Sequence, residues 1–501
     1  MTAVPFNRSW HSGGNPRTEG VLNRAHPWGF RCAARIASIS ANAAVAITLL
    51  VILSVFSVAP ATASSRGYLT TPKELAVIRQ KAQRGIEPYR TAVADVMGWA
   101  TRDWNFPLSA ETTCEGARDP LWDNFQGGTP ILYAKALAYH LTGDSRYAGQ
   151  VKDILQQIMS QVKRISLDEQ QCQLNFAWGT PELVASADLI EDYWKDATCV
   201  GPTGTRYDDT RIGTANCKVL FQNWLIKNPY YVFSQTTTRM MSNWGAAATN
   251  AAMYIADYVS DRPDVILVHR NPKEVNGGND YNFSPAESYR FIKAVTLKRM
   301  SMYAVGYHRT SCDYLSGPQQ SSQWLPVKSG ITQTGIVTED ARRKEYCNIP
   351  RYNGLYQNYP EVHLGNQIQQ CELMLRRGDS SCYDNIDMKD IPEYRFTGPD
   401  GVVRTTHLYA GRGSLERAID AIIIDAGAPW KRAGALSVAY RYYLNHKQLP
   451  QTDLGRWARF LEDGSGQCFQ DICFGTLTHG LARGENPSPP PTVPPPGGSG
   501  D

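Results

Sequence analysis

Two stretches of this chain carry side chains that are suited to chemistry on a saccharide. In the first, Asn243 and Trp244 open a run of small residues that extends to Tyr258. An amide can hydrogen-bond a sugar oxygen, and a neighbouring indole ring can cover a sugar face. The same pattern is also typical of a buried helix whose Asn caps the first turn. The pair is therefore a candidate carbohydrate contact, with a purely structural helix as the alternative.

The second stretch, residues 338–366, combines cationic, proton-carrying and amide side chains. They are Arg342, Arg343, Tyr356, Tyr359, His363 and Asn366. Arg binds a carboxylate through two parallel hydrogen bonds, while His and Tyr can carry protons. The alternative is a tyrosine-rich loop in which Arg342 pairs with Glu339 and His363 only packs. The stretch thus predicts acid–base chemistry next to a carboxylate.

Helical periodicity dominates the elements that must position these residues. Thr71 and Pro72 are typical of a helix start, and Gly143 lies in a tight turn between two predicted helices, which makes a helical hairpin. The predicted helices cover residues 72–82, 88–100, 130–141, 145–162, 182–194, 219–226, 240–258, 285–307, 361–375, 414–424 and 433–444. Alternating strand patterns and a glycine-rich phosphate loop are missing from the sequence. We therefore predict an all-α protein, an α/α toroid (an incomplete α/α barrel) of antiparallel helical hairpins.

The first 63 residues differ from the rest in charge. They hold five Arg and one Glu, which accounts for the whole formal net charge of +4. An apolar run at residues 43–59 is followed by Ala61-Thr62-Ala63, which is typical of a secretory signal peptide. The run is also nearly long enough for a membrane anchor. Residues 1–63 are thus predicted to be a signal peptide or N-terminal anchor, and the protein to be secreted or periplasmic.

The remaining chain divides by composition. Residues 64–485 are predicted to form the toroid domain, and the Pro/Gly-rich residues 486–501 a disordered, solvated tail. A domain without net charge argues against nucleic-acid binding. We expect membrane contact only if the N-terminal apolar segment is retained, and we expect a monomer.

Ten cysteines follow the leader and lack the paired short spacings of a zinc site. In an oxidising compartment they are expected to form disulfides. Short-range candidates are Cys199–Cys217, Cys371–Cys382 and Cys468–Cys473. Neither a metal nor a cofactor is predicted.

Taken in order, several short motifs resemble the alginate lyase superfamily, the α/α-toroid polysaccharide lyases related to mannuronate lyases. They are Thr71-Pro-Lys-Glu-Leu75, Leu141-Thr-Gly-Asp144, Asn243-Trp244, Glu339-Asp-Ala-Arg342, His363 and Leu415-Glu-Arg417, spread over residues 66–450. The resemblance implies that Asn243 and Arg342 neutralise a uronate carboxylate, and that His363 and a Tyr move protons. Tyr359 is our candidate, although Val362 occupies the position beside the His. Trp244 stands where mannuronate-specific members carry His.

These residues predict β-elimination on an acidic polysaccharide, with Asn243, Arg342, His363 and Tyr359 catalytic. Trp244, Tyr356, Arg343 and Asn366 are predicted to bind substrate. One alternative is a glycoside hydrolase, which needs two facing carboxyl groups; its candidates are Glu339, Asp340 and Glu361. Another is a polysaccharide-binding protein without activity. Lys293, Lys298 and Arg299 are expected on a solvated helix face, and His140 in packing.

Overall fold

A computed structural model of the protein describes part of the chain. The described residues are 65–104, 111–112, 120–167, 170–234, 240, 242–270, 280–301, 337, 340, 358–384, 394–397, 403–406, 414–425, 429–446, 454–462, 470 and 472–497. The chain divides into two units, Met1–Ala61 and Thr62–Asp501, and all described residues belong to the second. The predicted leader therefore lies outside the described residues. Within those residues, none of the helices has the length and apolarity needed to cross a membrane.

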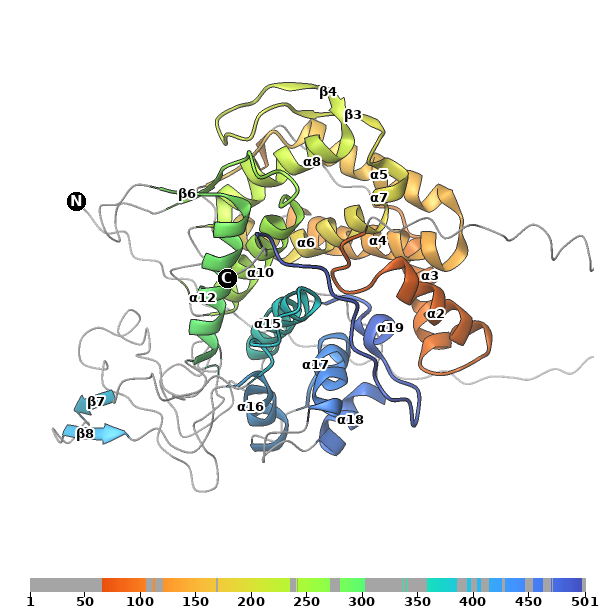
Figure 1. The fold of residues 1–501 in the computed structure, drawn as a ribbon, viewed down its shortest axis with the longest axis vertical. Coiled ribbons are helices and arrows are strands. Elements are labelled where there is room, and N and C mark those ends of the chain that lie inside the picture. The colour runs from red at the N-terminus through yellow and green to blue at the C-terminus, as the bar shows by residue number, and fades with distance from the viewer. Residues whose placement is uncertain are drawn as a thin grey trace, which may run out of the picture. The chain divides into compact units, whose positions relative to one another are not determined.

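Helices make up most of the described structure (Figure 1). They are α2 (Pro72–Gln83), α3 (Tyr89–Ala100), α4 (Pro120–Thr142), α5 (Ser145–Gln161), α6 (Gln170–Leu189), α7 (Glu191–Trp194), α8 (Cys217–Leu225), α10 (Asn243–Tyr258), α12 (Pro285–Ser301), α15 (Asn358–Arg376), α16 (Leu415–Asp420), α17 (Ala433–Asn445), α18 (Leu454–Glu462) and α19 (Gly475–His479), with π-helical turns η1 (Ile226–Tyr230) and η5 (Ala421–Asp425). The prediction of an all-α class is confirmed.

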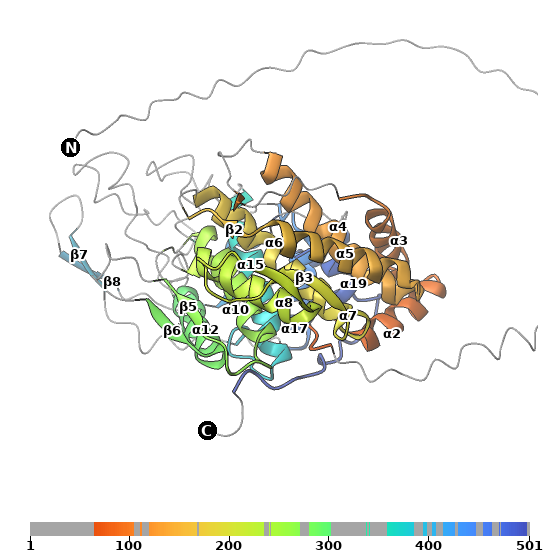
Figure 2. The same ribbon diagram turned by 90° about the horizontal axis from the view of Figure 1, so that it is seen from above.

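The helices form an inner row and an outer row (Figures 1 and 2). Along the inner row, α4 packs on α6, α6 on α10, α10 on α15, and α15 on α17. Outer helices cover this row: α3 and α5 pack on α4, α8 and α12 on α10, and α18 on α17. The last helix, α19, contacts α17, α2 and α3, and so joins the end of the row to its beginning. This arrangement is the predicted α/α toroid of helical hairpins.

Hydrogen bonds show that outer helices run opposite to the inner ones. Lys218, near the start of α8, pairs with Asp261 just beyond the end of α10 (2.8 Å). On the next outer helix, Lys293 pairs with Asp379 beyond the end of α15 (2.5 Å), whereas Arg299 reaches Thr249 in the first half of α10 (2.8 Å). Helices α10 and α15 thus share one direction, so their N-terminal ends lie together at one end of the toroid.

Local sequence signals explain several helix ends. Thr71 caps α2 by accepting a hydrogen bond from the Glu74 amide (3.2 Å), with Pro72 as the first helical residue. Asp144 caps α5 in the same way, accepting from the Arg146 amide (3.0 Å). Gly143 has φ +79°, a left-handed conformation that glycine adopts without steric cost. The predicted helix start at Thr71 and Pro72 and the predicted turn at Gly143 are confirmed, because these interactions span only a few residues.

Helix α10 is the central element of the described core. Every residue from Asn243 to Tyr258 is buried except Trp244, and the helix contacts α6, α8, α12 and α15. Its Gly and Ala residues are small, which lets these neighbours approach closely. The small-residue run of the sequence therefore marks a helix that is packed on nearly all sides.

Short strand pairs connect the helices, which the sequence patterns did not indicate. β1 (Glu111–Thr112) pairs in parallel with β2 (Arg164–Ile165), and β3 (Thr198–Pro202) pairs antiparallel with β4 (Ile212–Asn216). Two further antiparallel hairpins are β5 (Leu267–His269) with β6 (Tyr281–Phe283), and β7 (Tyr394–Thr397) with β8 (Val403–Thr406). Because each strand has two to five residues, alternation along it is too brief to be recognised.

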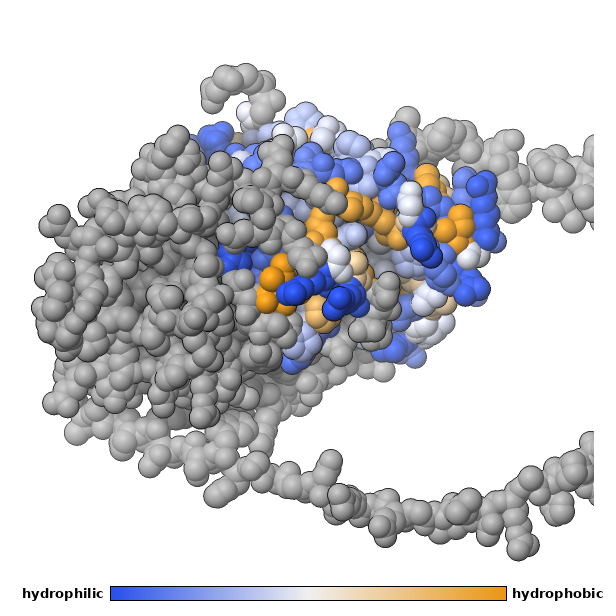
Figure 3. Space-filling view, turned by 90° about the horizontal axis from the view of Figure 1, so that it is seen from below, coloured by the Kyte–Doolittle hydropathy of each residue, from blue (hydrophilic) through white to orange (hydrophobic). Residues whose placement is uncertain are grey.

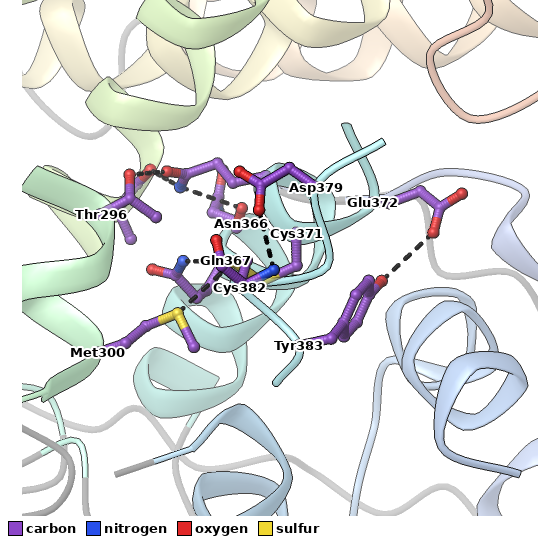
Figure 4. The surroundings of a disulfide bond; sticks show 12 residues. Thr296, Met300, Asn366, Gln367, Cys371, Glu372, Asp379, Cys382 and Tyr383 are labelled. Carbon is purple, nitrogen blue, oxygen red and sulfur yellow. Dashed lines mark hydrogen bonds between the residues drawn. A yellow bond between two sulfur atoms is a disulfide. The ribbon is translucent and has the colours of Figure 1, made fainter. Parts of the chain in front are cut away.

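Two of the three suggested disulfides are confirmed. Cys199–Cys217 ties β3 to the start of α8, and Cys371–Cys382 ties α15 to the segment that follows it (Figure 4). Cys172 is also disulfide-bonded. The third suggested pair includes Cys468, which lies outside the described residues.

Residues 65–67 are bound to the C-terminal ends of the inner helices. Asp188 accepts hydrogen bonds from the Ser65 hydroxyl (2.6 Å) and from the Gly67 amide (2.9 Å). Arg66 and Arg377 both pair with the buried Asp257, at 3.1 and 2.7 Å. The start of the described chain thus covers the end of the toroid that lies opposite the helix N-termini.

The C-terminal segment differs from the expected solvated tail. The Asn445 side chain donates to the Pro487 carbonyl (2.9 Å), and the Val493 amide donates to the Arg376 carbonyl (2.8 Å). Pro487 is buried. A polyproline backbone makes no internal hydrogen bonds, so its carbonyls are available to side chains of the domain. Residues 486–497 therefore lie against α15 and α17, where these helices end.

The surface of the described part is mixed in character. In the view of Figure 3, hydrophobic residues form small groups between hydrophilic ones. The exposed large hydrophobic residues come from separate elements: Val77, Tyr193, Val200, Val219, Ile266 and Tyr281. Isolated exposed apolar side chains of this kind are normal for globular proteins.

Candidate functional site

Helices α10 and α15 are linked by buried polar side chains along their length. The Asn250 amide donates to Asn366 (3.2 Å) and to Gln369 (2.6 Å). Nearer the C-terminal ends of both helices, Asp257 of α10 pairs with Arg377, which directly follows α15. Contacts therefore advance in the same direction on both helices, which makes them parallel. The N-terminal end of α10 consequently lies at the same end of the pair as the first turns of α15.

Asn243 is the first residue of α10, directly after the N-cap residue Ser242. Its side chain is 1% exposed, and its Oδ1 accepts no hydrogen bond from the part of the chain that the structure describes. A buried amide with unused hydrogen-bonding capacity is costly, and rotation of the amide plane presents Nδ2 in place of Oδ1. Trp244, the next residue, is half-buried. The predicted amide–indole pair therefore lies at a helix N-terminus.

Gly245 allows this end of α10 to pack closely. A Cβ at this position would lie 1.8 Å from the Met240 carbonyl oxygen and 3.1 Å from Arg299 Nη2. A side chain is therefore excluded unless the backbone shifts. The position of Asn243, two residues earlier, depends on this glycine.

His363 is held by a carboxylate at the start of α15. Its Nδ1 lies 2.9 Å from Asp340 Oδ2, and both side chains are completely buried. Burial lowers the pKa of His363, the hydrogen bond and charge of Asp340 oppose this shift, and the charge of Arg299 adds to it. A neutral imidazole that donates from Nδ1 to Asp340 leaves a lone pair on Nε2. The pair therefore provides a candidate general base.

Arg299 corrects a prediction from the sequence. It was expected on a solvated face, but it is 1% exposed and its Nη1 donates to Thr249 Oγ1 (2.8 Å). Its partners come from a distant helix, so local spacing could not reveal them. Lys293, from the same expected face, pairs with Asp379. Arg299 therefore brings a buried cation to the helix ends that carry Asn243 and His363.

The other predicted site residues divide into three groups. Asn366 is buried and links α10 to α15, and its Nδ2 also donates to the Val362 carbonyl (2.8 Å). Tyr359 is half-buried in the first turn of α15. The rest lie outside the described residues: Arg342, Arg343 and Tyr356. The roles predicted for these residues stay predictions.

Asp340 was weighed only as a carboxylate for the alternative hydrolase. In the structure it binds His363, whereas Glu361 is buried and accepts a hydrogen bond from the Lys431 amide (2.9 Å). Glu339 lies outside the described residues. Asp340 and Glu361 thus serve separate contacts, and no sequence spacing linked Asp340 to a histidine 23 positions away.

A cavity of about 80 Å³ lies at the opposite ends of α15 and α17, beneath the C-terminal prolines. Its charged lining includes Arg376, which pairs with Glu372 (2.7 Å) and Glu74 (3.0 Å). The charges of Arg376, Glu372 and Glu74 compensate one another in these ion pairs, so this cavity is not the candidate active site. Within the described part of the chain, no three His, Cys, Asp or Glu residues converge as metal ligands would.

Comparisons with known proteins add the following. No model of a known protein family matches this chain, and no curated protein sequence matches it. Among solved structures, the chain is similar to an alginate lyase from Bacteroides ovatus, with a TM-score of 0.40, 12% identity, and coverage of 79% of this chain and 96% of that one. It is also similar to an alginate lyase variant solved with a tetrasaccharide, with a TM-score of 0.40, 11% identity, and coverage of 77% and 91%.

Proposed function

We propose that this protein is a polysaccharide lyase that cleaves a uronic-acid polymer by β-elimination. The observation that carries the proposal is the buried His363–Asp340 pair at the same helix ends as the unsatisfied amide of Asn243. β-Elimination needs such a combination: hydrogen-bond donors for the substrate carboxylate and a base for the C5 proton.

The reaction breaks the C5–H bond and the C4–O4 bond and forms a C4=C5 double bond. His363 Nε2 accepts the C5 proton, and Tyr359, with Tyr356 as the other candidate, protonates the departing O4. Asn243, together with Arg342, binds the carboxylate and stabilises the negative charge that develops on it. Trp244, Arg343 and Asn366 are the proposed substrate-binding residues.

Electrostatics favour an anion at this end of the toroid. The N-termini of α10 and α15 each carry a partial positive charge, and the buried guanidinium of Arg299 lies beside them. Asp340 and Glu361 bring negative charge to the same end, where they are bound by His363 and by the Lys431 amide. The residues after the leader have no net charge, so this local field, rather than the whole molecule, is proposed to attract the substrate.

His363 is completely buried, so the proposal requires that its surroundings open to admit a sugar. Burial lowers the pKa of His363, so its imidazole is neutral and can accept the C5 proton. Asp340 has a positioning role: it fixes the tautomer and the ring orientation without touching the substrate.

The protein is also proposed to be exported. The disulfides Cys199–Cys217 and Cys371–Cys382 are typical of an oxidising compartment. The predicted signal peptide leads to the same compartment.

The test is an assay for unsaturated uronate on residues 64–501. The protein is incubated with alginate, pectate, polyglucuronate and glycosaminoglycans, and the ultraviolet absorbance of the conjugated double bond is followed. We expect product from one polymer, lost in Asn243→Ala and in His363→Ala. His140→Ala is the matched control, because His140 hydrogen-bonds the Leu189 carbonyl at the C-terminal end of α6, at the opposite end of the helices from Asn243 and His363. It should retain activity.

The alternatives give different results in the same experiment. Reducing ends without unsaturated product would replace the lyase with a hydrolase. Retention on one polymer with neither product would indicate a binding protein without activity. Loss of activity in His140→Ala equal to that in His363→Ala would mean that the His363 variant reports only on packing.

A further inference from the structure

The proline-rich segment after Glu485 is buried with a period of three. Every third residue is buried or half-buried: Pro487, Pro490, Val493 and Pro496. The residues between them are exposed, apart from the half-buried Pro495. A polyproline II helix has three residues per turn, so every third side chain lies on the same face. The segment therefore has the burial pattern of a polyproline II helix that lies with one face against the domain.

Side chains of α17 bind the first turn of this segment. A polyproline II backbone makes no hydrogen bonds of its own, which leaves its carbonyls available. The Asn445 side chain donates to the Pro487 carbonyl (2.9 Å), and Arg441 Nη2 donates to the Ser488 carbonyl (3.4 Å). Because Arg441 and Asn445 are four residues apart on α17, they lie on the same face of that helix. Two successive carbonyls of the segment are therefore bound by one face of α17.

Val493 interrupts the prolines at the place where the domain offers an acceptor. Its amide donates to the carbonyl of Arg376 (2.8 Å). Arg376 is the last residue of α15, and the last carbonyls of a helix have no partner within the helix itself. A proline in place of Val493 would lack the amide hydrogen that makes this bond. The sequence of the segment thus matches the helix end on which it lies.

The two ends of the segment contact elements that are far apart in the chain. Glu485 accepts hydrogen bonds from Lys81 of α2 and from the Tyr89 hydroxyl of α3 (2.7 Å). At the other end, a Cβ on Gly497 would lie 2.8 Å from the Cβ of Ala286, at the start of α12. The segment therefore runs from the first hairpin across α17 and α15 to α12 (Figure 1). At about 3.1 Å per residue it spans roughly 30 Å, which is enough to cross helices packed about 10 Å apart.

We propose that residues 485–497 act as a strap, a docked polyproline II helix that holds the α2–α3 hairpin, α17, α15 and α12 together. The strap crosses the C-terminal ends of α15 and α17, so it closes the end of the toroid opposite the candidate site. It joins the first helices of the domain to later ones, as α19 does, and so strengthens the closure of the ring. This role does not depend on the proposed function.

The test compares full-length variants in which the same number of prolines is replaced. Pro487→Ala/Pro496→Ala changes the buried face of the strap, and the matched control Pro491→Ala/Pro494→Ala changes two exposed prolines. The oxidised proteins are unfolded in urea and followed by circular dichroism. The buried pair should lower the unfolding midpoint by about 0.5 M, because buried apolar surface is lost, and the control pair by less than about 0.1 M.

Hydrogen exchange measured by mass spectrometry shows where the strap acts. In Pro487→Ala/Pro496→Ala, exchange should become at least about tenfold faster in the α2–α3 hairpin and at the start of α12, because local opening of the elements that the strap joins becomes easier. Exchange in α5 should stay as in the wild type, because α5 lies outside the contacts of the strap described above. The control variant should exchange as the wild type does in all of these helices.

A second pair of variants changes one hydrogen-bond donor and keeps the polyproline II conformation. Val493→Pro removes the amide that binds the Arg376 carbonyl, whereas Thr492→Pro adds a proline at the exposed neighbouring position. Only Val493→Pro should lower the urea midpoint. The proposal is overturned if the buried and exposed proline pairs shift the midpoint equally, if Val493→Pro is as stable as Thr492→Pro, or if exchange in the α2–α3 hairpin and α12 is unchanged in the buried-pair variant.

Discussion

Glu416 allows a quantitative test of how burial controls ionisation in this fold. It lies on α16, is 1% exposed, and neither carboxyl oxygen accepts a hydrogen bond from the described residues. Burial, and then the charge of Asp420 one turn later, raises its pKa to about 8. Asp420 itself accepts a hydrogen bond from the Trp457 indole (2.8 Å). Glu416 is therefore expected to be protonated at neutral pH.

The sign of the pH effect follows from the two states. Between the unfolded pKa near 4.3 and the folded value near 8, the folded protein holds a proton that the unfolded chain has lost, so the free energy of unfolding falls as pH rises. The contribution of Glu416 is complete below the unfolded pKa and is lost by about pH 8. At about 1.4 kcal/mol per pH unit, the loss amounts to roughly 4 to 5 kcal/mol.

The variant Glu416→Gln cannot ionise and should lose this pH dependence. Relative to the wild type, its stability should be similar at pH 4 and on the order of 4 kcal/mol greater at pH 8. Urea unfolding of the oxidised protein, followed by circular dichroism at both pH values, measures this difference. The matched control Glu287→Gln, at an exposed position on α12, should show no gain at pH 8. A Glu416→Gln difference that is equal at pH 4 and pH 8 would refute the reasoning.

Three further predictions concern the contacts between helices. Asp340→Asn should lower kcat about 10- to 100-fold, because the tautomer of His363 is no longer fixed. The same variant should move the acidic limb of the pH–activity profile to lower pH, because Asp340 raises the pKa of His363. Asp257→Asn should destabilise the protein by about 3 to 5 kcal/mol at pH 7, because it leaves buried arginine charge unpaired. Arg charges lower the pKa of Asp257 against the effect of burial. The destabilisation relative to the wild type should therefore shrink as pH falls through the acidic range. Gly245→Ala should cost about 1 to 3 kcal/mol in urea unfolding, since its Cβ meets the Met240 carbonyl, and should lower activity by moving the start of α10.

The outcomes that would contradict these predictions are specific. An unchanged pH profile in Asp340→Asn would show that Asp340 does not act on His363. A destabilisation by Asp257→Asn that grows at low pH would contradict the assigned ion pairs. Gly98→Ala is the control for Gly245→Ala, because a Cβ at Gly98 meets no atom within 4 Å. Equal effects of the two alanine variants would show that the contact at Met240 is unimportant.

Features that depend on neighbouring residues were predictable from the sequence. Thr71 and Asp144 cap their helices through bonds to residues two or three positions away, and Gly143 makes the turn between α4 and α5. The helical hairpins and the small-residue helix around Asn243 follow from such local patterns. Disulfides between cysteines close in sequence were predictable for the same reason.

Helix starts were less predictable where tertiary packing overrides local preference. Pro130 was expected to begin a helix, but it lies inside α4, and Pro181 lies inside α6. A proline inside a helix costs a hydrogen bond and a steric clash. Both positions are buried between inner helices, and packing there outweighs this cost.

The sequence by itself determined the helical class and the hairpin order. It also suggested two of the cysteine pairs and the choice of Asn243 and His363 as candidates. Tertiary structure alone decided that Asp340 holds His363 and that Arg299 is buried beside them. It also decided that Tyr207 and Tyr231 stack, and that the C-terminal prolines lie against the domain. The physical reason is the same in each case: a hydrogen bond or ring contact between residues far apart in the chain exists only after the helices that carry them have packed.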